Sequence, residues 1–520
     1  MECQTVYLKV AGMKPLPDRF SAGAWATAAA VLERWLARRG RLDALLEEAG
    51  RKWPVGGPGL PLAVTGQEAA QASGPATSLV AALAARQERA RCQHLLYGAV
   101  RHLGRINAAL ETVISQPPRA RLQAVLLLAG FELLEAGAEP SGEGQAAKIV
   151  HHAVGQAKTL LSPPEARLVN AVLRKLPATP GFHAATPAPA AGAAELARFF
   201  SHPEWLIRRW LAQFGADATQ RLLRWNQTPP PVYARWRSAA TPPPIPAPAD
   251  GPTDRGGTVG AGGVVAGIQP PAFLQPTSWA GVYVVPAGNW PEIERLLAGG
   301  ALYLQDPATM IAPELLDPKA GETVVDLCAA PGGKSLVLAD LLEERGRRAG
   351  LGTGAGTVVA VDLPDVRRIG RLKENLARAR TTGVILVQAD VLQLSSRLLK
   401  EHHLPGAFSA ILLDVPCSNT GVMRHRVDVK WRLREADIAK HAGQQLALLS
   451  AAARFVAPGG RLVYSTCSLE SEENEEVVEA FLRGAGGRFS LEQTRHRRPW
   501  EDDCDGAGAF LLRKNAQLKT

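Results

Sequence analysis

The sequence contains few cysteines and no long apolar segment. Its six cysteines are Cys3, Cys92, Cys328, Cys417, Cys467 and Cys504. None belongs to a CxxC pair, and six are too few for a disulfide scaffold in a chain of 520 residues. No uninterrupted apolar run reaches the roughly 18 residues that a membrane helix needs, and Met1–Phe20 has no apolar signal core. We therefore expect a cytoplasmic protein with free thiols, no metal and no membrane partner.

The composition indicates a basic protein with more than one domain. A chain of 520 residues is too long for one ordinary core, so we expect two or three domains. The formal net charge is +10 and the isoelectric point is about 9.5. This charge suits a polyanion partner such as nucleic acid, although solvated Arg-rich surfaces give the same balance.

Helical periodicity dominates the first third of the chain. Apolar residues recur at helical spacing in five segments: Ala24–Ala49, Gln87–Leu110, Arg119–Ala136, Gly144–Leu161 and Pro164–Leu176. The Gly/Pro-rich stretch Pro54–Ser78 predicts a loop. We therefore predict an all-α domain over residues 1–177, followed by an Ala/Pro-rich linker at 178–193.

The rest of the chain divides into a small middle region and a larger α/β domain. Residues 194–317 are predicted to form an α+β region with a disordered Pro/Gly insert at 241–271. Strands and helices alternate in residues 318–520, which predicts a doubly wound, Rossmann-like sheet. The predicted strands are Thr323–Leu327, Thr357–Asp362, Val384–Gln388, Phe408–Asp414 and Arg461–Ser465. The predicted helices are Lys334–Arg345, Asp365–Arg380, Gln444–Val456 and Asn474–Leu482.

Polar residues gather where these strands end, which is where such sheets bind ligands. They are Asp326, Asp362, Asp390, Asp414 and Cys467. An acid at the end of the second strand can bond ribose hydroxyls, but a helix N-cap is an alternative role, and the favoured one for Asp362 taken alone. Asp390 is open to the same two interpretations.

A tight turn of small residues follows the first strand, in the string Asp326-Leu-Cys-Ala-Ala-Pro-Gly-Gly-Lys334. Small residues let a backbone approach a ligand closely, and the helix that follows offers free N–H groups. The string matches neither GxGxxG nor GxxxxGK[ST], so it indicates neither a nicotinamide nor a P-loop site.

Two cysteines follow neighbouring strands. Cys417 lies in Asp414-Val-Pro-Cys-Ser-Asn-Thr-Gly421, and Cys467 lies in Ser465-Thr-Cys-Ser468. A free cysteine is more often an inert buried residue than a nucleophile. An exposed thiol in a polar loop near basic groups, however, can have a lowered pKa and react.

Together these strings resemble the motifs of two-cysteine RNA cytosine-5 methyltransferases, and in particular the bacterial ribosomal RNA small subunit methyltransferase B (Sun/Fmu) family. The resemblance runs from Leu304–Pro307 to Asp505–Leu512. Leu95–Arg101 and Leu168–Arg174 resemble the NusB-like RNA-binding domain of that family, and Ser201–Trp210 resembles its middle region.

The resemblance implies a reaction and a set of site residues. The reaction would transfer a methyl group from S-adenosylmethionine to carbon 5 of a cytidine in 16S ribosomal RNA, either naked or in an assembling small subunit. Cys467 would attack carbon 6, Cys417 would assist proton removal and product release, Asp414 would bond the base edge, and Lys334 would support either the thiolates or the cofactor. The implied cofactor-binding residues are Cys328, Ala329, Ala330, Pro331, Gly332, Gly333, Lys334, Asp362, Asp390 and Asp414.

The chain departs from the family at two places. Asn419 stands where the family often has Gly, and Arg424–Asp428 reads Arg-His-Arg-Val-Asp where Arg-Arg-His-Pro-Asp is common. We expect both departures on the substrate side, without contact to either cysteine. Their position leaves the target nucleotide open.

Residues 198–237 are a candidate RNA contact. They carry seven arginines and two acids, interleaved with Trp205, Trp210, Trp225 and Trp236. Arginine and aromatic side chains suit phosphates and unstacked bases, but ordinary helix packing is the favoured explanation for most of these tryptophans.

Two other classes of function remain open at this point. A non-catalytic RNA-binding assembly factor conflicts with the intact cysteines and glycine turn. A methyltransferase for DNA or small molecules conflicts with the basic helical domain and the specific cysteine pair.

Overall fold

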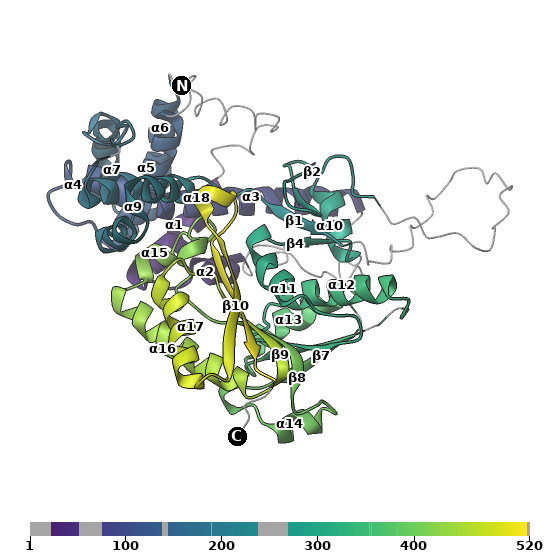
Figure 1. Cartoon of the computed structure of the whole chain (residues 1–520). Coiled ribbons are helices and arrows are strands. Elements are labelled where there is room, and N and C mark those ends of the chain that lie inside the picture. Colours follow the sequence, from purple (N-terminus) through teal and green to yellow (C-terminus); the bar gives the residue numbers. More distant parts are fainter. Residues whose placement is uncertain are drawn as a thin grey trace. The chain divides into compact units, whose positions relative to one another are not determined.

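The protein is described here by a computed structural model that covers residues 22–50, 75–137, 144–188, 190–237, 269–352, 354, 356–381 and 383–516. The chain forms two compact units (Figure 1). The first unit is Met1–Pro230 with Val422–Asp437, and the second is Pro231–Gly421 with Ile438–Thr520. Within the described ranges, none of the helices combines the length and the apolar character that crossing a membrane requires.

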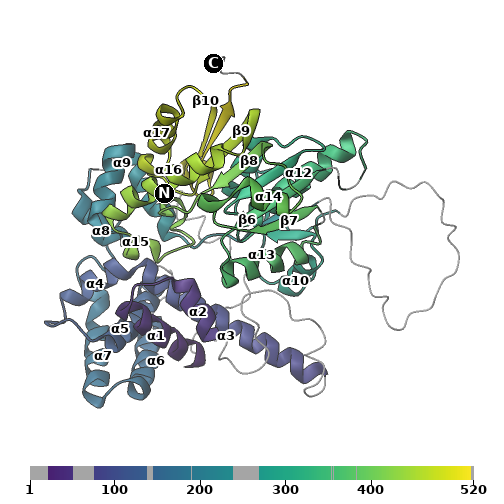
Figure 2. The same cartoon turned by 90° about the horizontal axis from the view of Figure 1, so that it is seen from below.

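The first unit is helical, as the sequence predicts. Its helices are α1 (Ala22–Ala37), α2 (Leu42–Gly50), α3 (Pro75–Arg101), α4 (Leu103–Glu111), α5 (Ala120–Gly137), α6 (Gln145–Leu160), α7 (Pro163–Lys175), α8 (Ala193–Phe200), α9 (Glu204–Gln227) and α15 (Val429–Arg432) (Figure 2). Helix α5 is buried along most of its length. The start of α7 carries a capping box formed by Ser162 and Glu165.

Two of the predicted helices are interrupted. The segment Ala24–Ala49 breaks between α1 and α2, where the Trp35 indole donates to the Gly40 carbonyl oxygen at 3.0 Å. The segment Gln87–Leu110 breaks at His102, which has non-helical torsion angles. The apolar periodicity continues across both breaks because the helices on either side pack into one core. Residues 75–78 begin α3, so the predicted loop Pro54–Ser78 is wrong there, and residues 54–74 lie outside the described ranges.

A segment from far along the chain completes the core of the first unit. Val427 is fully buried among the apolar side chains of the helices, and Trp431 packs against the same cluster. The Trp431 indole donates to the Val100 carbonyl oxygen at 2.9 Å. Nζ of the buried Lys430 donates to the Arg101 carbonyl oxygen at 3.0 Å. The first unit is therefore not built from N-terminal residues alone.

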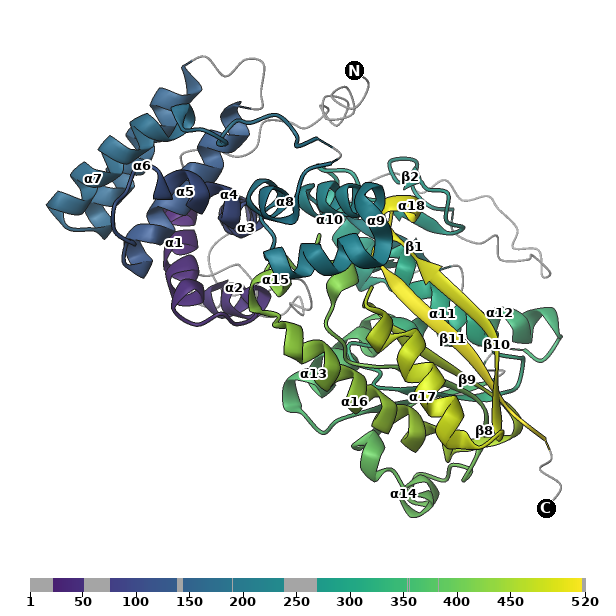
Figure 3. The ribbon, with the colours of Figure 1, turned by 60° about the vertical axis from the view of Figure 1, so that its left-hand side comes forward.

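The second unit is built on a seven-stranded sheet. Its strands are β5 (Thr323–Leu327), β6 (Thr357–Asp362), β7 (Val384–Gln388), β8 (Phe408–Asp414), β9 (Val456–Thr466), β10 (Phe489–Arg497) and β11 (Ala507–Lys514), in the order β10-β11-β9-β8-β5-β6-β7. The five predicted strands are parallel, and β11 runs antiparallel to both of its neighbours (Figure 3). The sequence prediction missed the β10–β11 hairpin. Most residues of the edge strand β10 are exposed and polar, so they give no apolar pattern.

Helices cover both faces of this sheet (Figure 1). One face is covered by α11 (Ile311–Leu316), α12 (Gly333–Arg348) and α13 (Val366–Arg378), and the other by α14 (Ser396–Glu401), α16 (Glu435–Ala453) and α17 (Glu475–Ala485). Neighbouring residues of β5 point to opposite faces, since Val324 packs with the first set and Val325 with the second. Helix α16 begins at Glu435, earlier than the predicted Gln444.

A smaller antiparallel sheet belongs to the same unit. Its order is β2-β3-β1-β4, formed by β1 (Tyr233–Trp236), β2 (Gln275–Pro276), β3 (Val282–Val284) and β4 (Leu302–Leu304), and α10 (Trp290–Ala298) lies against it. Arg235 and Arg237 are buried and pair with Asp340 on α12, with N–O distances of 2.6 and 2.7 Å. The predicted middle region, 194–317, thus gives α8 and α9 to the first unit and these strands to the second. Its predicted insert, 241–271, lies outside the described residues up to 268.

Several arginines and tryptophans of the candidate RNA contact, residues 198–237, make contacts inside the protein. Two of its seven arginines, Arg235 and Arg237, are buried in ion pairs and hydrogen bonds. Trp210 is completely buried, as expected for ordinary helix packing. Trp225 instead lies under the Arg424 guanidinium, 3.9 Å from its ring centroid.

Candidate active site

The carboxyl ends of the parallel strands place the predicted acids and Cys467 along one edge of the sheet. Asp414 in β8 is in register with Ser465 in β9, two residues before Cys467. Asp362 ends β6 in register with Gln388 of β7, two residues before Asp390. Asp326 lies one residue inside the end of β5 and is buried, with the Ser335 hydroxyl donating to it at 2.5 Å. Burial raises the pKa of Asp326 to about 7.

The turn Cys328–Lys334 has the geometry of a backbone cradle. Cys328 and Gly332 both have positive φ angles, 64° and 104°. The φ angle of Gly332 favours glycine, and a Cβ atom there would also lie 2.7 Å from a methyl carbon of Leu372. The Ala330 N–H donates to Asp362 Oδ2 at 2.7 Å, which ties the turn to the end of β6. Helix α12 (Gly333–Arg348) begins within the last residues of this turn, and its first N–H groups suit an anionic or polar ligand.

Asp362 does not cap a helix. Asp365 is the N-cap of α13 and accepts from the backbone N–H groups of its first turn, so the capping alternative for Asp362 is wrong. Both Asp362 oxygens bind Arg368, at 2.6 Å from Nε and 2.9 Å from the terminal nitrogen. The hydrogen bond to Asp362 raises the pKa of Arg368. Arg368 is not predicted as a site residue, because its sequence position does not distinguish it from the other arginines of α13.

Asp390 has a capping contact. It precedes the short helix η4 (Val391–Gln393) and accepts from the Leu392 N–H at 2.9 Å. Its side chain remains half-buried, so a cofactor role for Asp390 stays a prediction. Leu363 follows Asp362 directly, Leu392 lies two residues after Asp390, and their side chains are 46% and 44% exposed.

Asp414 joins two neighbouring elements through its carboxylate. The Lys334 ammonium donates to Oδ2 at 2.7 Å, and the Ser465 hydroxyl donates to Oδ1 at 2.8 Å. Burial alone would lower the pKa of Lys334, but Asp414 outweighs it and the pKa is raised. Lys334 therefore stays charged at neutral pH and holds Asp414 in place.

The two candidate cysteines meet at this edge. Their Sγ atoms lie 3.2 Å apart, with Cys417 buried and Cys467 half-buried. The hydrogen bond with Cys467, followed by burial, raises the pKa of Cys417 well above its ordinary value. Cys417 therefore keeps its proton at neutral pH. Cys92, by contrast, is a packing residue of the helical core. Burial raises its pKa to about 12.

Asn419 corrects one expectation from the sequence. We expected this departure from the family to avoid both cysteines, but its side chain contacts both cysteine loops. Its Nδ2 donates to the Cys417 carbonyl oxygen at 2.7 Å, and its Oδ1 accepts from the Cys467 thiol at 3.5 Å. Its φ angle of 63° explains why a glycine suits the same position, since asparagine and glycine both tolerate left-handed backbone.

The sheet order, the backbone cradle and the acids along one edge form a ligand-binding edge of the Rossmann-like class. The family described as 16S rRNA methyltransferase RsmB/F matches residues 313–498, and the NusB family matches residues 66–177. The ribosomal RNA small subunit methyltransferase B of Vibrio cholerae is 31% identical over 455 residues, covering 84% of this chain and 93% of that protein. The chain therefore belongs to the ribosomal RNA small subunit methyltransferase B family.

A second relative agrees with this assignment, and one solved structure shares the fold. The probable ribosomal RNA small subunit methyltransferase B of Bacillus subtilis is 29% identical over 413 residues, covering 76% of this chain and 80% of that protein. The crystal structure of PH0851 has the same fold, with a TM-score of 0.63 at 23% sequence identity. That similarity covers 94% of this chain and 99% of PH0851.

Proposed function

We propose that this protein methylates carbon 5 of a cytidine in 16S ribosomal RNA through a covalent bond between Cys467 and carbon 6. The observation that carries the proposal is the pair of thiols, with their sulfurs 3.2 Å apart, at the strand edge that also holds the cofactor cradle. The names of the curated relatives support a ribosomal RNA substrate, and the NusB match supports RNA binding.

The first step overcomes the weak nucleophilicity of carbon 5. The Cys467 thiolate adds to carbon 6, and the ring electrons move to carbon 5, which becomes enamine-like. Asp414, held by Lys334 and Ser465, bonds the N3/N4 edge of the ring. S-adenosylmethionine would supply the methyl group, held by the turn Cys328–Lys334 together with Asp362 and Asp390.

The second step releases the product and involves Cys417. The hydrogen bond with Cys467 is the largest cause of the raised pKa of Cys417. That cause disappears once the Cys467 sulfur is bonded to carbon 6, so the pKa of Cys417 falls, with burial as the main remaining cause that raises it, and Cys417 gives up its proton at this stage. The Cys417 thiolate takes the proton from carbon 5, the electrons of that C–H bond form the C5–C6 double bond, and Cys467 leaves as a thiolate.

A target base inside a duplex is out of reach, so the cytidine must be single-stranded or flipped out. The test is to incubate the protein and S-adenosylmethionine with naked 16S ribosomal RNA, with partly assembled small subunits and with DNA. We expect 5-methylcytidine in nucleosides from one or both RNA substrates, and bisulfite sequencing then locates the position. Methylation of DNA alone, or of another nucleoside, would contradict the proposal.

A further inference from the structure

The buried carboxylate of Glu473 contacts both cysteine loops. Glu473 ends the short helix η6 (Ser471–Glu473), in the turn between β9 and α17, and has no exposed surface. We infer that Glu473 is a positioning residue that holds the Cys417 and Cys467 loops at the spacing used by the two-cysteine reaction. The inference rests on the proposed function, in which the two sulfurs act in turn on one ring.

The Glu473 carboxylate receives hydrogen bonds from both loops. Its Oε1 accepts from the Ser418 N–H and from Gln445 Nε2, both at 2.9 Å. Its Oε2 accepts from the hydroxyls of Ser418 and Ser468, the latter at 2.5 Å. Ser418 directly follows Cys417, and Ser468 directly follows Cys467, so one carboxylate ties the residue after each cysteine.

The backbones of the two cysteine loops are also in direct contact, so the hydrogen bonds of Glu473 to both loops can set the distance between the two sulfurs. The Gly421 N–H donates to the Cys467 carbonyl oxygen at 3.0 Å, and the Leu469 N–H donates to the Thr420 hydroxyl at 2.9 Å. A Cβ atom at Gly421 would lie 2.7 Å from the Cys467 carbonyl oxygen. A small displacement of either loop therefore moves one sulfur relative to the other.

A carboxylate suits this position because it accepts several hydrogen bonds at once. The four bonds above come from neutral donors in three separate segments, and a buried charge needs such compensation. Glutamine has the same size, and the two serine hydroxyls can rotate to accept from its amide. Alanine leaves all four donors without this acceptor, so the loops must rearrange.

The experiment measures the sulfur spacing without requiring methyl transfer. The full-length protein is treated with diamide, which takes two electrons and two protons from a pair of thiols and leaves a disulfide. Peptide mapping then gives the rate at which Cys417 becomes linked to Cys467. We expect Glu473→Ala to slow this linkage about tenfold or more, and Glu473→Gln to stay within about threefold of the unchanged protein.

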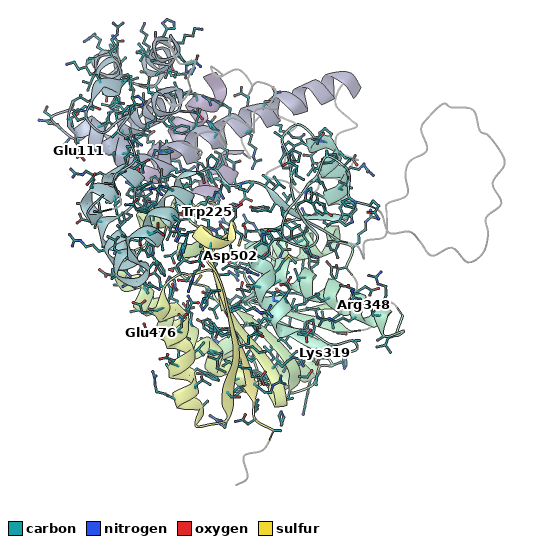
Figure 4. The ribbon with its side chains drawn as sticks, turned by 45° about the horizontal axis from the view of Figure 1, so that its top comes forward. Glu111, Trp225, Lys319, Arg348, Glu476 and Asp502 are labelled. Carbon is teal, nitrogen blue, oxygen red and sulfur yellow. The ribbon has the colours of Figure 1, made fainter. Side chains whose placement is uncertain are left out.

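A matched control lies one turn further along the chain. Glu476, labelled in Figure 4, is exposed on α17 and accepts from the Ser471 hydroxyl at 3.0 Å. Glu476→Ala should link Cys417 to Cys467 at the unchanged rate. If Glu473→Ala does not fold, the double variant Ser418→Ala/Ser468→Ala removes the hydroxyl ties and should slow the linkage instead. An unchanged linkage rate in the folded variants overturns the inference, even if their melting temperature falls.

The amount of covalent protein–RNA adduct provides a second measurement, made during turnover. With both cysteines intact, Glu473→Ala should accumulate a covalent protein–RNA adduct, because a displaced Cys417 no longer reaches the proton on carbon 5. Affinity for S-adenosylmethionine should stay unchanged. If the unchanged protein makes no 5-methylcytidine, the proposed function fails, while the diamide rates still decide whether Glu473 sets the spacing.

Discussion

The sulfur atoms of Cys417 and Cys467 lie 3.2 Å apart although 50 positions separate them in the sequence. They meet because β8 and β9 are parallel neighbours, with Asp414 in register with Ser465, and each cysteine follows the end of its strand. Packing alone explains the burial of Cys417. It does not explain why Cys467 remains half-buried in a polar loop at the strand edge that also carries the backbone cradle Cys328–Lys334.

Asp362 and Asp365 are separated by only two residues, but substituting each of them by alanine should have a different effect. Asp362→Ala removes hydrogen bonds that would hold the cofactor ribose, and should weaken S-adenosylmethionine binding by roughly 1–3 kcal/mol. Asp365→Ala removes the N-cap of α13 and should lower stability by about 1 kcal/mol without a similar loss of affinity. Calorimetric titration together with thermal melting checks both. Equal losses of affinity in the two variants would remove Asp362 from the cofactor site.

The helical unit should need residues 422–437 to be stable. The fragment 1–230 lacks Val427, whose burial contributes about 1.5–3 kcal/mol, and the Trp431 hydrogen bond to Val100. A synthetic peptide of residues 422–437 should raise the melting temperature of this fragment. The same peptide with Val427→Asp should not. A fragment that melts at the same temperature with and without the peptide would contradict this account.

Lys430 should make stability depend on pH. Burial, and then Arg101, lowers the pKa of Lys430 well below its ordinary value. Between that lowered pKa and about 10.4 the unfolded chain binds one more proton than the folded chain at this residue, so stability rises with pH across this window. Lys430→Met removes this dependence. Guanidinium denaturation at several pH values should show the difference between variant and unchanged protein shrinking as pH rises, whereas parallel curves would be contrary to expectation.

The left-handed backbone at Asn419 gives a simple test of loop strain. Glycine adopts this conformation readily, so Asn419→Gly should leave stability nearly unchanged. A β-branched residue does not, so Asn419→Val should cost about 1–2 kcal/mol. Chemical denaturation of the two variants measures this. If both lose the same stability, the side-chain bonds of Asn419 matter more than its backbone conformation.

Much of the second unit follows from local sequence patterns. Buried parallel strands read as continuous apolar runs, so Val358–Val361 and Ile411–Leu413 identify β6 and β8 directly. The acids Asp362 and Asp414 stand out because they end such runs. The edge strand β10 has no such pattern, because most of its residues face solvent.

The residues that the sequence did not predict depend on contacts between distant segments. Glu473 binds Ser418 across 55 positions, and its own neighbourhood contains several other glutamates. Val427 lies in a stretch after β8 that no helical pattern connects to the N-terminal unit. Arg368 differs from the other arginines of α13 only in its bond to Asp362.

The two cysteine variants test the central claim most directly. RNA containing the target cytidine is incubated with S-adenosylmethionine and either Cys467→Ala or Cys417→Ala, and the products are run on a denaturing gel. Cys467→Ala should form no covalent adduct and no 5-methylcytidine, because no thiolate attacks carbon 6. Cys417→Ala should accumulate a protein–RNA adduct whose digestion places the RNA on Cys467. An adduct that forms in Cys467→Ala, or full turnover in both variants, would contradict the account.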